Sequence, residues 1–393
     1  MKRIGIYGGA FNPPHIGHLK GAKYALESLD LAKMLLIPSC VSPHKPLPEN
    51  SPTASQRLEM LRFAVTDPRM EVSDLELSRG GTSYTFETVE TVKVQYPDDE
   101  LILLMGTDMF LSFDRWRSPE RILRNASIAV MCRGEKGEKA AIAEKMPVLQ
   151  QMGAKIYVIE NPVTAISSTD LRRMLIFDCA GEYLPPQVLS YIRGNRLYGI
   201  EKDYRNLPEE ELEKAVVSLL KPNRVPHVLG CRDAAVELAR LWGADEKAAA
   251  RAGLLHDITK ALDGPLQIAL CRAYGAEIDE FSLRNPKILH AYTGSLVAER
   301  IFGESAAVVD AIRTHTAAAA DMNILQKIIY VADYMEPNRS FDGVEELRHL
   351  AHTDIDKALK MGIIWATDIL RQQGREISPD SLAALEELAQ KGV

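Results

Sequence analysis

The feature that most constrains the fold is an alternation of short apolar runs with longer amphipathic segments, which stops near residue 200. Apolar runs separated by helical patterns are typical of βαβ units, whose strands form a parallel sheet. We expect helices between the strands, at residues 18–29, 55–65, 86–95 and 140–151. The expected strands are Arg3–Tyr7, Met34–Pro38, Glu71–Ser73, Leu101–Met105, Ile128–Cys132 and Lys155–Ile159.

The second half of the chain shows helical patterns only. Segments rich in Ala, Leu and Glu are interrupted by Gly, Pro and Asn. A length of 393 residues also exceeds what one hydrophobic core usually supports. We therefore predict an α/β domain with a parallel sheet at residues 1–198, a linker at 194–207, and an all-α domain at residues 199–393. Its helices are expected at Glu209–Leu220, Cys231–Trp242, Ala291–Ile301, Ile324–Tyr334 and Asp380–Gln390.

Charge and cysteine content limit the classes of function. The formal net charge of -7 gives no general reason to expect binding to nucleic acid or to an anionic membrane. The five cysteines are odd in number and widely spaced, a pattern typical of reduced thiols. The sequence shows no signal-peptide core and no apolar run of membrane-spanning length, so we expect a cytoplasmic protein without membrane contact.

The segment from Gly8 to His18, Gly-Gly-Ala-Phe-Asn-Pro-Pro-His-Ile-Gly-His, directly follows the first expected strand. Glycines allow the backbone to approach a phosphate closely, and a helix N-terminus presents N–H groups and a positive dipole end to an anion. His15 and His18 lie three residues apart, near enough for both imidazoles to address one polyphosphate. The alternative is an ordinary strand-to-helix turn with a buried histidine. Two histidines flanking Gly17 favour the phosphate site.

A second segment of this kind is Ile-Ser-Ser-Thr-Asp-Leu-Arg-Arg, at residues 166–173. Hydroxyl residues that open a helix are ordinary N-cap material, so this segment by itself has a purely structural explanation. Its functional interpretation is a second helix N-terminus, whose hydroxyls and Arg172 hold the β and γ phosphates of ATP. A guanidinium suits this role because it donates forked hydrogen bonds to phosphate oxygens. Together the two segments predict a nucleotide clamp.

These segments resemble the H-x-G-H and I-S-S-T-x-x-R signatures of the nucleotidylyltransferase superfamily. Within it, residues 1–198 are similar to the bacterial nicotinate mononucleotide adenylyltransferases. Further matches to that family lie at residues 37–39, 43–45, 83–85, 106–108 and 115–117. The resemblance implies a Rossmann-like fold and transfer of AMP from ATP, with Mg²⁺, to nicotinate mononucleotide. The products would be deamido-NAD and pyrophosphate.

The resemblance also implies roles for individual residues. Both reacting groups are anionic, so catalysis depends mainly on positioning and charge neutralisation. The residues implied to stabilise the transferring phosphate are His15, His18 and Arg172. Those implied to hold ATP and its Mg²⁺ are Gly8, Gly9, Phe11, Lys45, Asp108, Ser167, Ser168 and Thr169. Those implied to bind the nicotinate nucleotide are Thr85, Trp116 and Arg117, although Trp116 could also be a partly buried anchor.

Histidine and aspartate recur in the helical half in the order H…HD…H…H…D. Imidazole with carboxylate suits Zn, Mn or Fe, and the absence of nearby cysteine argues against a thiolate site. Asp333 ends an otherwise apolar run, where a carboxylate is costly unless it is paired or binds metal. The alternative is a set of unrelated surface histidines, but the ordered set favours a metal site. The expected ligands are His227, His256, Asp257, His290, His315 and Asp333.

This order resembles the HD phosphohydrolase superfamily, and residues 205–372 are similar to bacterial HD-domain hydrolases that cleave diadenosine tetraphosphate symmetrically. The resemblance implies an HD-type helical domain with two transition-metal ions, iron in preference, and cleavage of that substrate into two ADP. Lys260 and Arg339 are candidate phosphate contacts, although both could be solvated surface charges. Residues 316–321, Thr-Ala-Ala-Ala-Ala-Asp, depart from the family's Thr-Gly followed by a basic residue. The sequence therefore supports metal binding more strongly than it supports the identity of the substrate.

Three hypotheses for function follow from these patterns. The first is a bifunctional enzyme that acts on ATP, nicotinate mononucleotide and diadenosine tetraphosphate. In the second, the helical domain senses a nucleotide without turnover or acts on another phosphate ester. The third, an RNA-binding synthetase-like protein, is disfavoured by the acidic charge and by the lack of a K-M-S-K-S segment. The subunit assembly stays open, a homo-oligomer included.

Overall fold

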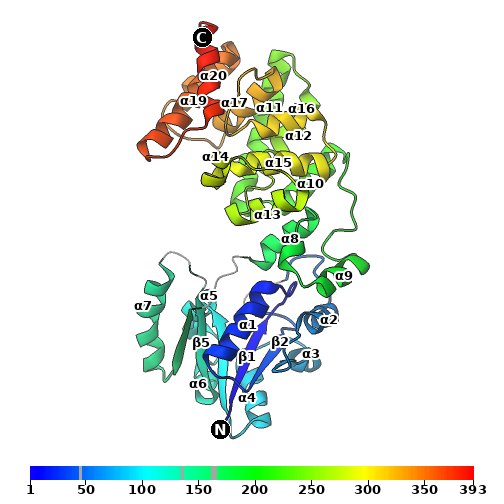
Figure 1. Ribbon diagram of the computed structural model, residues 1–393, viewed down its shortest axis with the longest axis vertical. Helices are drawn as coiled ribbons and strands as arrows, with labels where there is room; N and C mark the ends of the chain where they lie inside the picture. The colour runs from blue at the N-terminus through cyan, green and yellow to red at the C-terminus, as the bar shows by residue number, and fades with distance from the viewer. Residues whose placement is uncertain (44–46, 133, 135–136, 161–165) are drawn as a thin grey trace. The chain divides into compact units, whose positions relative to one another are not determined.

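The computed structural model describes residues 1–43, 47–132, 134, 137–160 and 166–393. The chain divides into two compact units, Met1–Glu201 and Lys202–Val393 (Figure 1). This division falls inside the predicted linker, between a helix that ends at Gly194 and one that begins at Glu209. Among the described residues, none of the helices has the length and apolar character that a membrane crossing would need.

Six strands form one parallel sheet in the first unit: β1 (Arg3–Gly9), β2 (Lys33–Pro38), β3 (Met70–Val72), β4 (Glu100–Gly106), β5 (Ala126–Cys132) and β6 (Ile156–Glu160). All six predicted strands are confirmed, with ends shifted by one or two residues. Their order is β3-β2-β1-β4-β5-β6. The order reverses beside β1, which pairs with β2 on one side and β4 on the other. Ligands of parallel sheets bind at the carboxyl ends of strands beside such a reversal.

The helices of the first unit are α1 (Ile16–Ser28), α2 (Ala54–Ala64), α3 (Leu75–Arg79), α4 (Thr85–Gln95), α5 (Thr107–Leu111), α6 (Pro119–Asn125), α7 (Glu138–Gln151), α8 (Ser168–Ile176) and α9 (Pro186–Gly194). The four helices expected from periodicity are confirmed as α1, α2, α4 and α7. The helices α3, α5 and α6 contain five to seven residues. They are too short to show a helical period in the sequence.

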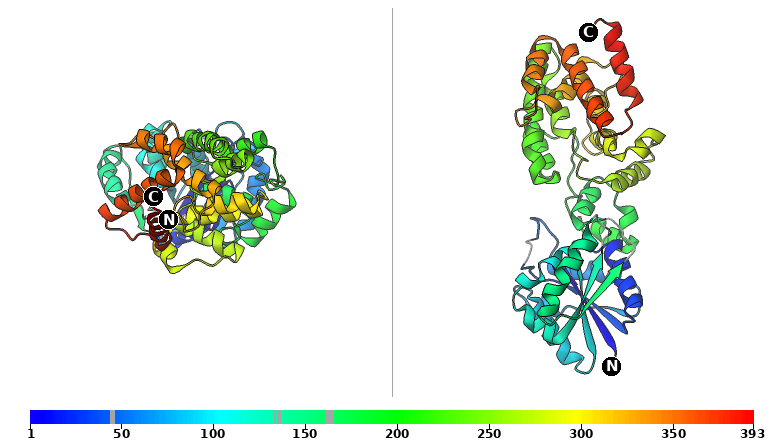
Figure 2. Two further views of the ribbon diagram at one scale, coloured as in Figure 1. Left: turned by 90° about the horizontal axis from the view of Figure 1, so that it is seen from above. Right: turned by 90° about the vertical axis from the view of Figure 1, so that its left-hand side faces the viewer.

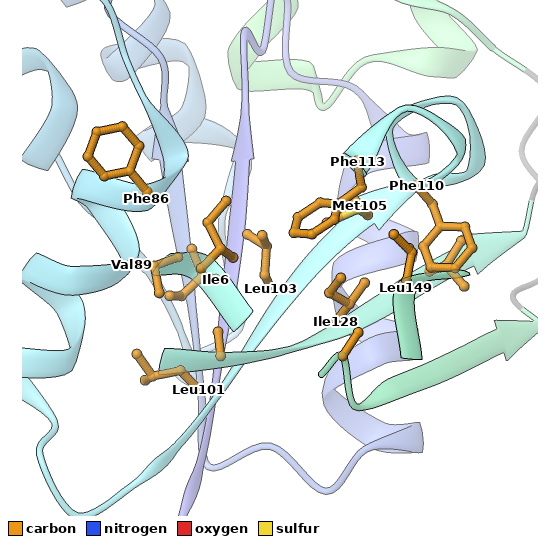
Figure 3. Close-up of a cluster of buried hydrophobic side chains, with 14 of the residues drawn as sticks. Ile6, Phe86, Val89, Leu101, Leu103, Met105, Phe110, Phe113, Ile128 and Leu149 are labelled. Atoms are coloured by element: carbon orange, nitrogen blue, oxygen red, sulfur yellow. The ribbon is translucent and has the colours of Figure 1, made fainter. Parts of the chain in front are cut away.

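Apolar side chains pack on both faces of the sheet, which explains why its central strands read as continuous apolar runs. Successive residues of β4 alternate between the faces. Leu101, Leu103 and Met105 join a cluster that includes residues of α4, α6 and α7, part of which is drawn in Figure 3. Ile102 and Leu104 join the opposite cluster, with residues of α1 and α2. The sheet is thus a rigid platform for the loops at its carboxyl end.

The second unit is helical throughout its described residues, which run from 202 to 393 without a gap (Figure 2). The five expected helices are confirmed as α10, α11, α15, α17 and α20. Helix α11 begins six residues earlier than expected, because Pro226 is tolerated in its first turn. The helices are α10 (Glu209–Leu219), α11 (Val225–Trp242), α12 (Glu246–Leu255), α13 (Gly264–Tyr274), α14 (Glu280–Arg284), α15 (Leu289–Arg300), α16 (Ala306–Arg313), α17 (Ile324–Met335), α18 (Val344–Thr353), α19 (Ile355–Gln372) and α20 (Pro379–Gln390).

Candidate nucleotide and metal sites

The first candidate site lies where β1 ends and α1 begins. Helix α1 starts at Ile16 with His15 as its N-cap residue, so the predicted start at His18 is two residues late. Both histidines therefore belong to one helix N-terminus, where backbone N–H groups and the helix dipole favour an anion. Their ring centroids lie 3.7 Å apart, with the ring planes 31° from parallel.

Close contacts orient the two rings. The backbone N–H of His15 donates to Nδ1 of His18 over 3.3 Å. A neutral His18 ring then carries its proton on Nε2, the form that can donate to a phosphate oxygen. A Cβ on Gly17 would lie 3.0 Å from Nδ1 of His15, inside ordinary van der Waals contact. The absence of a side chain at Gly17 is what lets His15 take this position.

Phe11, Gly8 and Gly9 serve the site in different ways. The Phe11 ring is only 1% exposed and packs edge-on against His18, with 5.1 Å between centroids. The aromatic side chain therefore supports His18 from the core, and contact between Phe11 and ATP would come from its backbone. In the part of the chain that the structure describes, a Cβ on Gly8 would meet nothing within 4 Å, and one on Gly9 would make only an ordinary contact with Phe11. The end of β1 is open to a close approach.

Arg172 joins the second predicted segment to the loop after β1. Ser167 is the N-cap residue of α8, and Ser168 and Thr169 are its first two helical residues. Arg172 donates to the carbonyl oxygen of Asn12 over 2.9 Å and to Oγ1 of Thr169 over 3.1 Å. The two segments that the sequence singles out therefore meet at the same edge of the sheet.

A buried arginine that was not predicted from the sequence also bonds to the loop after β1. Arg57 of α2 is 1% exposed and donates to the carbonyl oxygens of Ala10 and Ser39, each over 2.7 Å. Burial lowers the pKa of its guanidinium. Tyr198 adds a hydrogen bond to Oδ1 of Asn12 over 2.8 Å. Arg172 is one cation beside the loop between β1 and α1, and Arg57 is a second.

A pocket of about 190 Å³ collects the residues implied to bind the nicotinate nucleotide. Trp116 is partly buried against Phe113, with 5.2 Å between ring centroids, so it is both an anchor and a pocket wall. The guanidinium of Arg117 lies 4.5 Å from the ring centre of Tyr84. The lining residues are Pro43, Tyr84, Thr85, Arg115, Trp116 and Arg117.

Two further residues were implied to hold ATP. Asp108 is exposed and lies in the first turn of α5, directly after β4. Because β4 pairs with β1, their carboxyl ends lie side by side, and Asp108 belongs to the same edge of the sheet as Gly8. Lys45 lies outside the described residues.

The six expected metal ligands converge from five segments of the second unit. The imidazoles and Asp257 are buried, none more than 7% exposed. The ligands lie at the first turn of α11 (His227), directly after α12 (His256 and Asp257), in α15 (His290), after α16 (His315) and in the last turn of α17 (Asp333). The fold thus brings together the whole set that the sequence order suggested.

Hydrogen bonds from Nδ1–H to backbone carbonyl oxygens explain how three of the imidazoles are oriented. In His256, His290 and His315, Nδ1 lies 2.7, 2.8 and 2.7 Å from the carbonyl oxygen three residues earlier in the chain. A ring that donates through Nδ1 presents the lone pair of Nε2 to a metal ion. His227 differs, because its Nδ1 lies 3.1 Å from Oε1 of Glu336.

The carboxylate of Asp257 divides the ligands into two sets. Its Oδ2 lies 3.6 Å from Nε2 of His256 and 3.8 Å from Nε2 of His227. Its Oδ1 lies 3.3 Å from Nε2 of His290 and 3.6 Å from Nε2 of His315. These distances suggest two candidate positions for metal, and we define the first metal position as Oδ2 of Asp257 with His227, His256 and Asp333. The second metal position is Oδ1 of Asp257 with His290 and His315.

Atoms at the centre of this cluster fit a cation. Oδ1 of Asp257 and Nε2 of His315 are buried and have no hydrogen-bond partner among the described residues. Burial lowers the pKa of His256 to about 4, so its ring is neutral and able to bind metal at neutral pH. Burial opposes ionisation of Asp333, but its bond with His227 and the nearby His256 keep its pKa well below the usual value. Neutral imidazoles with carboxylates form a donor set suited to divalent transition metals.

Three cations border the cluster. Arg224 donates from Nε to Oδ2 of Asp257 over 2.5 Å. Arg339 donates to Oδ1 of Asp333 over 2.7 Å. Lys260 places Nζ 2.7 Å from Nε2 of His290. Lys260 and Arg339 were candidates from the sequence, whereas Arg224, in a short turn before α11, carries no recognisable motif.

Comparisons with family models give one match in each half of the chain. Residues 6–174 match the cytidylyltransferase-like family, and residues 224–338 match the HD domain. A probable nicotinate-nucleotide adenylyltransferase from Borreliella burgdorferi is 35% identical over 198 residues, which cover 50% of this chain and 96% of that protein. Another, from Synechococcus, is 37% identical over 203 residues, which cover 50% of this chain and 97% of that protein.

Among solved structures, a predicted HD superfamily hydrolase involved in NAD metabolism from Clostridium acetobutylicum is 34% identical, with a TM-score of 0.46. The match covers 47% of this chain and 98% of that one. The sequence matches to the adenylyltransferases span nearly their whole length. Through its first unit, with an HD domain following it, the chain belongs to the nicotinate-nucleotide adenylyltransferase family.

Proposed function

We propose that the first unit transfers the adenylyl group of ATP to nicotinate mononucleotide. The observation that carries this proposal is the hydrogen bond from Arg172 to the carbonyl oxygen of Asn12. It brings the N-terminus of α8 to the N-terminus of α1, where His15 and His18 lie. Two helix N-termini, two imidazoles and an arginine then surround one polyphosphate. The adenylyltransferases that match this unit support nicotinate mononucleotide as the acceptor.

In the proposed reaction, a phosphate oxygen of nicotinate mononucleotide attacks the α-phosphorus of ATP. A new P–O bond forms, the bond to the oxygen bridging the α and β phosphates breaks, and pyrophosphate leaves. Both reactants are anions, so the protein contributes positioning and charge neutralisation without a covalent nucleophile. His15, His18 and Arg172 neutralise charge on the transferring phosphate.

The remaining residues of the proposed site bind the two substrates. Gly8 and Gly9 allow ATP to approach the end of β1, and Asp108 contacts its ribose or adenosine. The hydroxyls at the start of α8, together with Lys45, hold the phosphates, and Mg²⁺ bound with ATP supplies further positive charge. The group that opens α8 is Ser167, Ser168 and Thr169. The pocket residues that bind the nicotinate nucleotide are Thr85, Trp116 and Arg117.

We propose that the second unit hydrolyses diadenosine tetraphosphate symmetrically to two ADP, using two divalent ions. The two-sided carboxylate of Asp257 is the observation that carries this proposal, because each oxygen faces a different set of imidazoles. Two bound ions, of which iron is the first to test, supply Lewis acidity and an activated water. Arg224, Lys260 and Arg339 neutralise the charge of a polyphosphate at the cluster.

The alternative for the second unit is nucleotide sensing or hydrolysis of another phosphate ester. It is favoured by one observation: residues 317–320 are all alanine, so this part of the segment after His315 offers no cation to a substrate. ADP release from diadenosine tetraphosphate with added Fe²⁺ or Mn²⁺ distinguishes the two. Metal binding without ADP release would support sensing.

One pair of variants tests both assignments. His18→Ala should lower dinucleotide formation from ATP and nicotinate mononucleotide by about 10²-fold or more, a typical cost of losing one charge-stabilising group. It should leave ADP release unchanged. His256→Ala should do the reverse, because it removes a ligand of the first metal position. Loss of both activities in either folded variant would contradict the assignment of two separate sites.

A further inference from the structure

Glu336 distinguishes His227 from the other histidines of the metal cluster. The other three are held by a carbonyl oxygen of their own chain segment, three residues away. His227 instead meets a side chain 109 residues distant, with 3.1 Å between Nδ1 and Oε1 of Glu336. Its Nε2 lies 3.1 Å from Oδ1 of Asp333. Glu336 thus faces one nitrogen of this ring, and Asp333, at the same end of α17, faces the other.

The surroundings of Glu336 fix its carboxylate in this position. The residue is 1% exposed, and Oε2 accepts hydrogen bonds from the backbone N–H of Asn338 over 2.7 Å and from its Nδ2 over 2.9 Å. A Cβ on Gly230 would overlap Oε2, so only glycine leaves room for it. A buried carboxylate is costly unless its oxygens are satisfied. Here Asn338 satisfies one oxygen, and the other is directed at His227.

We propose that Glu336 is a positioning residue for the first metal position, an inference that rests on the metal-dependent function proposed above. By accepting the Nδ1–H of His227, Glu336 selects the tautomer whose Nε2 binds metal and holds the ring in place. A carboxylate partner also makes the ligand nitrogen a better electron donor than a carbonyl partner does. The histidines of the second metal position are oriented by backbone carbonyls. Loss of Glu336 therefore weakens one ion and spares the other.

The test is Mn²⁺ binding by the full chain without nucleotide, measured by equilibrium dialysis with metal analysis. We expect two ions per chain in the wild type. Glu336→Gln should keep one at wild-type affinity and bind the other about 10–100-fold more weakly, as is usual when an outer partner of a ligand is lost. The visible spectrum of the Co²⁺-loaded protein should lose the contribution of one site. Glu304→Gln is the matched control: Glu304 is another buried carboxylate of this unit, paired with Arg251 over 2.6 Å.

The possible results distinguish a failure of the metal-dependent function from a failure of the role proposed for Glu336. A wild type that binds no Mn²⁺ would overturn the metal-dependent function and this inference with it. A wild type that binds two ions, with Glu336→Gln binding both as tightly or both equally weakly, would overturn the role of Glu336 alone. Should Glu336→Gln fail to fold, Asn338→Ala decides, because Asn338 is exposed and its amide supports Glu336. It should weaken one ion and leave the other, and unchanged binding of both would overturn the inference.

Discussion

Replacing Gly17 with alanine should separate the activity of the first unit from its stability. The new Cβ would lie 3.0 Å from Nδ1 and 3.1 Å from Cε1 of His15, whereas comfortable contacts are about 3.5–4.0 Å. The His15 ring must therefore shift by a few tenths of an ångström, and the His18 ring, whose centroid lies 3.7 Å away, is displaced with it. A misplacement of about 1 Å costs about 10²-fold in rate. The shift here is smaller, so we expect kcat to fall by about 3–10-fold, equivalent to about 0.7–1.4 kcal/mol of activation free energy.

The stability of the Gly17→Ala protein should change little. Alanine is favoured over glycine within a helix by about 1 kcal/mol, which offsets the cost of moving the ring. The assay is pyrophosphate release at saturating ATP and nicotinate mononucleotide, with thermal unfolding measured in parallel. Gly194→Ala is the matched control, because a Cβ on this last residue of α9 would meet no described atom within 4 Å. A folded Gly17→Ala protein with wild-type kcat would refute the claim that the placement of His15 governs turnover.

Two further substitutions test the surroundings of the first site. Arg57→Lys should lower kcat/KM for ATP by about 10-fold or more, because an ammonium lacks the planar fork that reaches two carbonyl oxygens. Steady-state kinetics on the folded protein check this, and an unchanged kcat/KM would show that the loop after β1 does not need Arg57. Trp116→Ala should raise KM for nicotinate mononucleotide by about 10-fold, close to 1.4 kcal/mol, and leave KM for ATP unchanged. Equal effects on both substrates would mean that Trp116 acts only as an anchor.

The strands were predictable because the sheet is buried on both faces. The central strands are then continuous apolar runs, as at Leu101–Met105, and their positions do not depend on distant partners. Helix starts were less accessible. Helix α1 begins at Ile16 because His15 adopts an extended conformation and caps it. The residue types around Pro13 do not predict this starting point. The helices after β3 and β4 were not predicted because they are too short to show a helical period in the sequence.

The residues missed at the sites have partners that are remote in sequence. Arg57 bonds to a carbonyl 47 residues away, and Glu336 to an imidazole 109 residues away, so no local motif marks either role. One signal was present for Arg57. It shares the buried face of α2 with Met60, Leu61 and Ala64, and an arginine at such a position needs polar partners. By contrast, the metal ligands were recognisable because their order along the chain is itself informative.

The most direct test of the account follows the α-phosphorus of ATP. The wild-type protein is incubated with Mg²⁺, nicotinate mononucleotide and ATP labelled at the α-phosphate, and the products are separated and quantified. The account predicts that the label enters the dinucleotide, with one unlabelled pyrophosphate released per dinucleotide formed. Label that stays in ATP, or appears in AMP without dinucleotide, would contradict the claim that the two helix N-termini and their histidines transfer an adenylyl group.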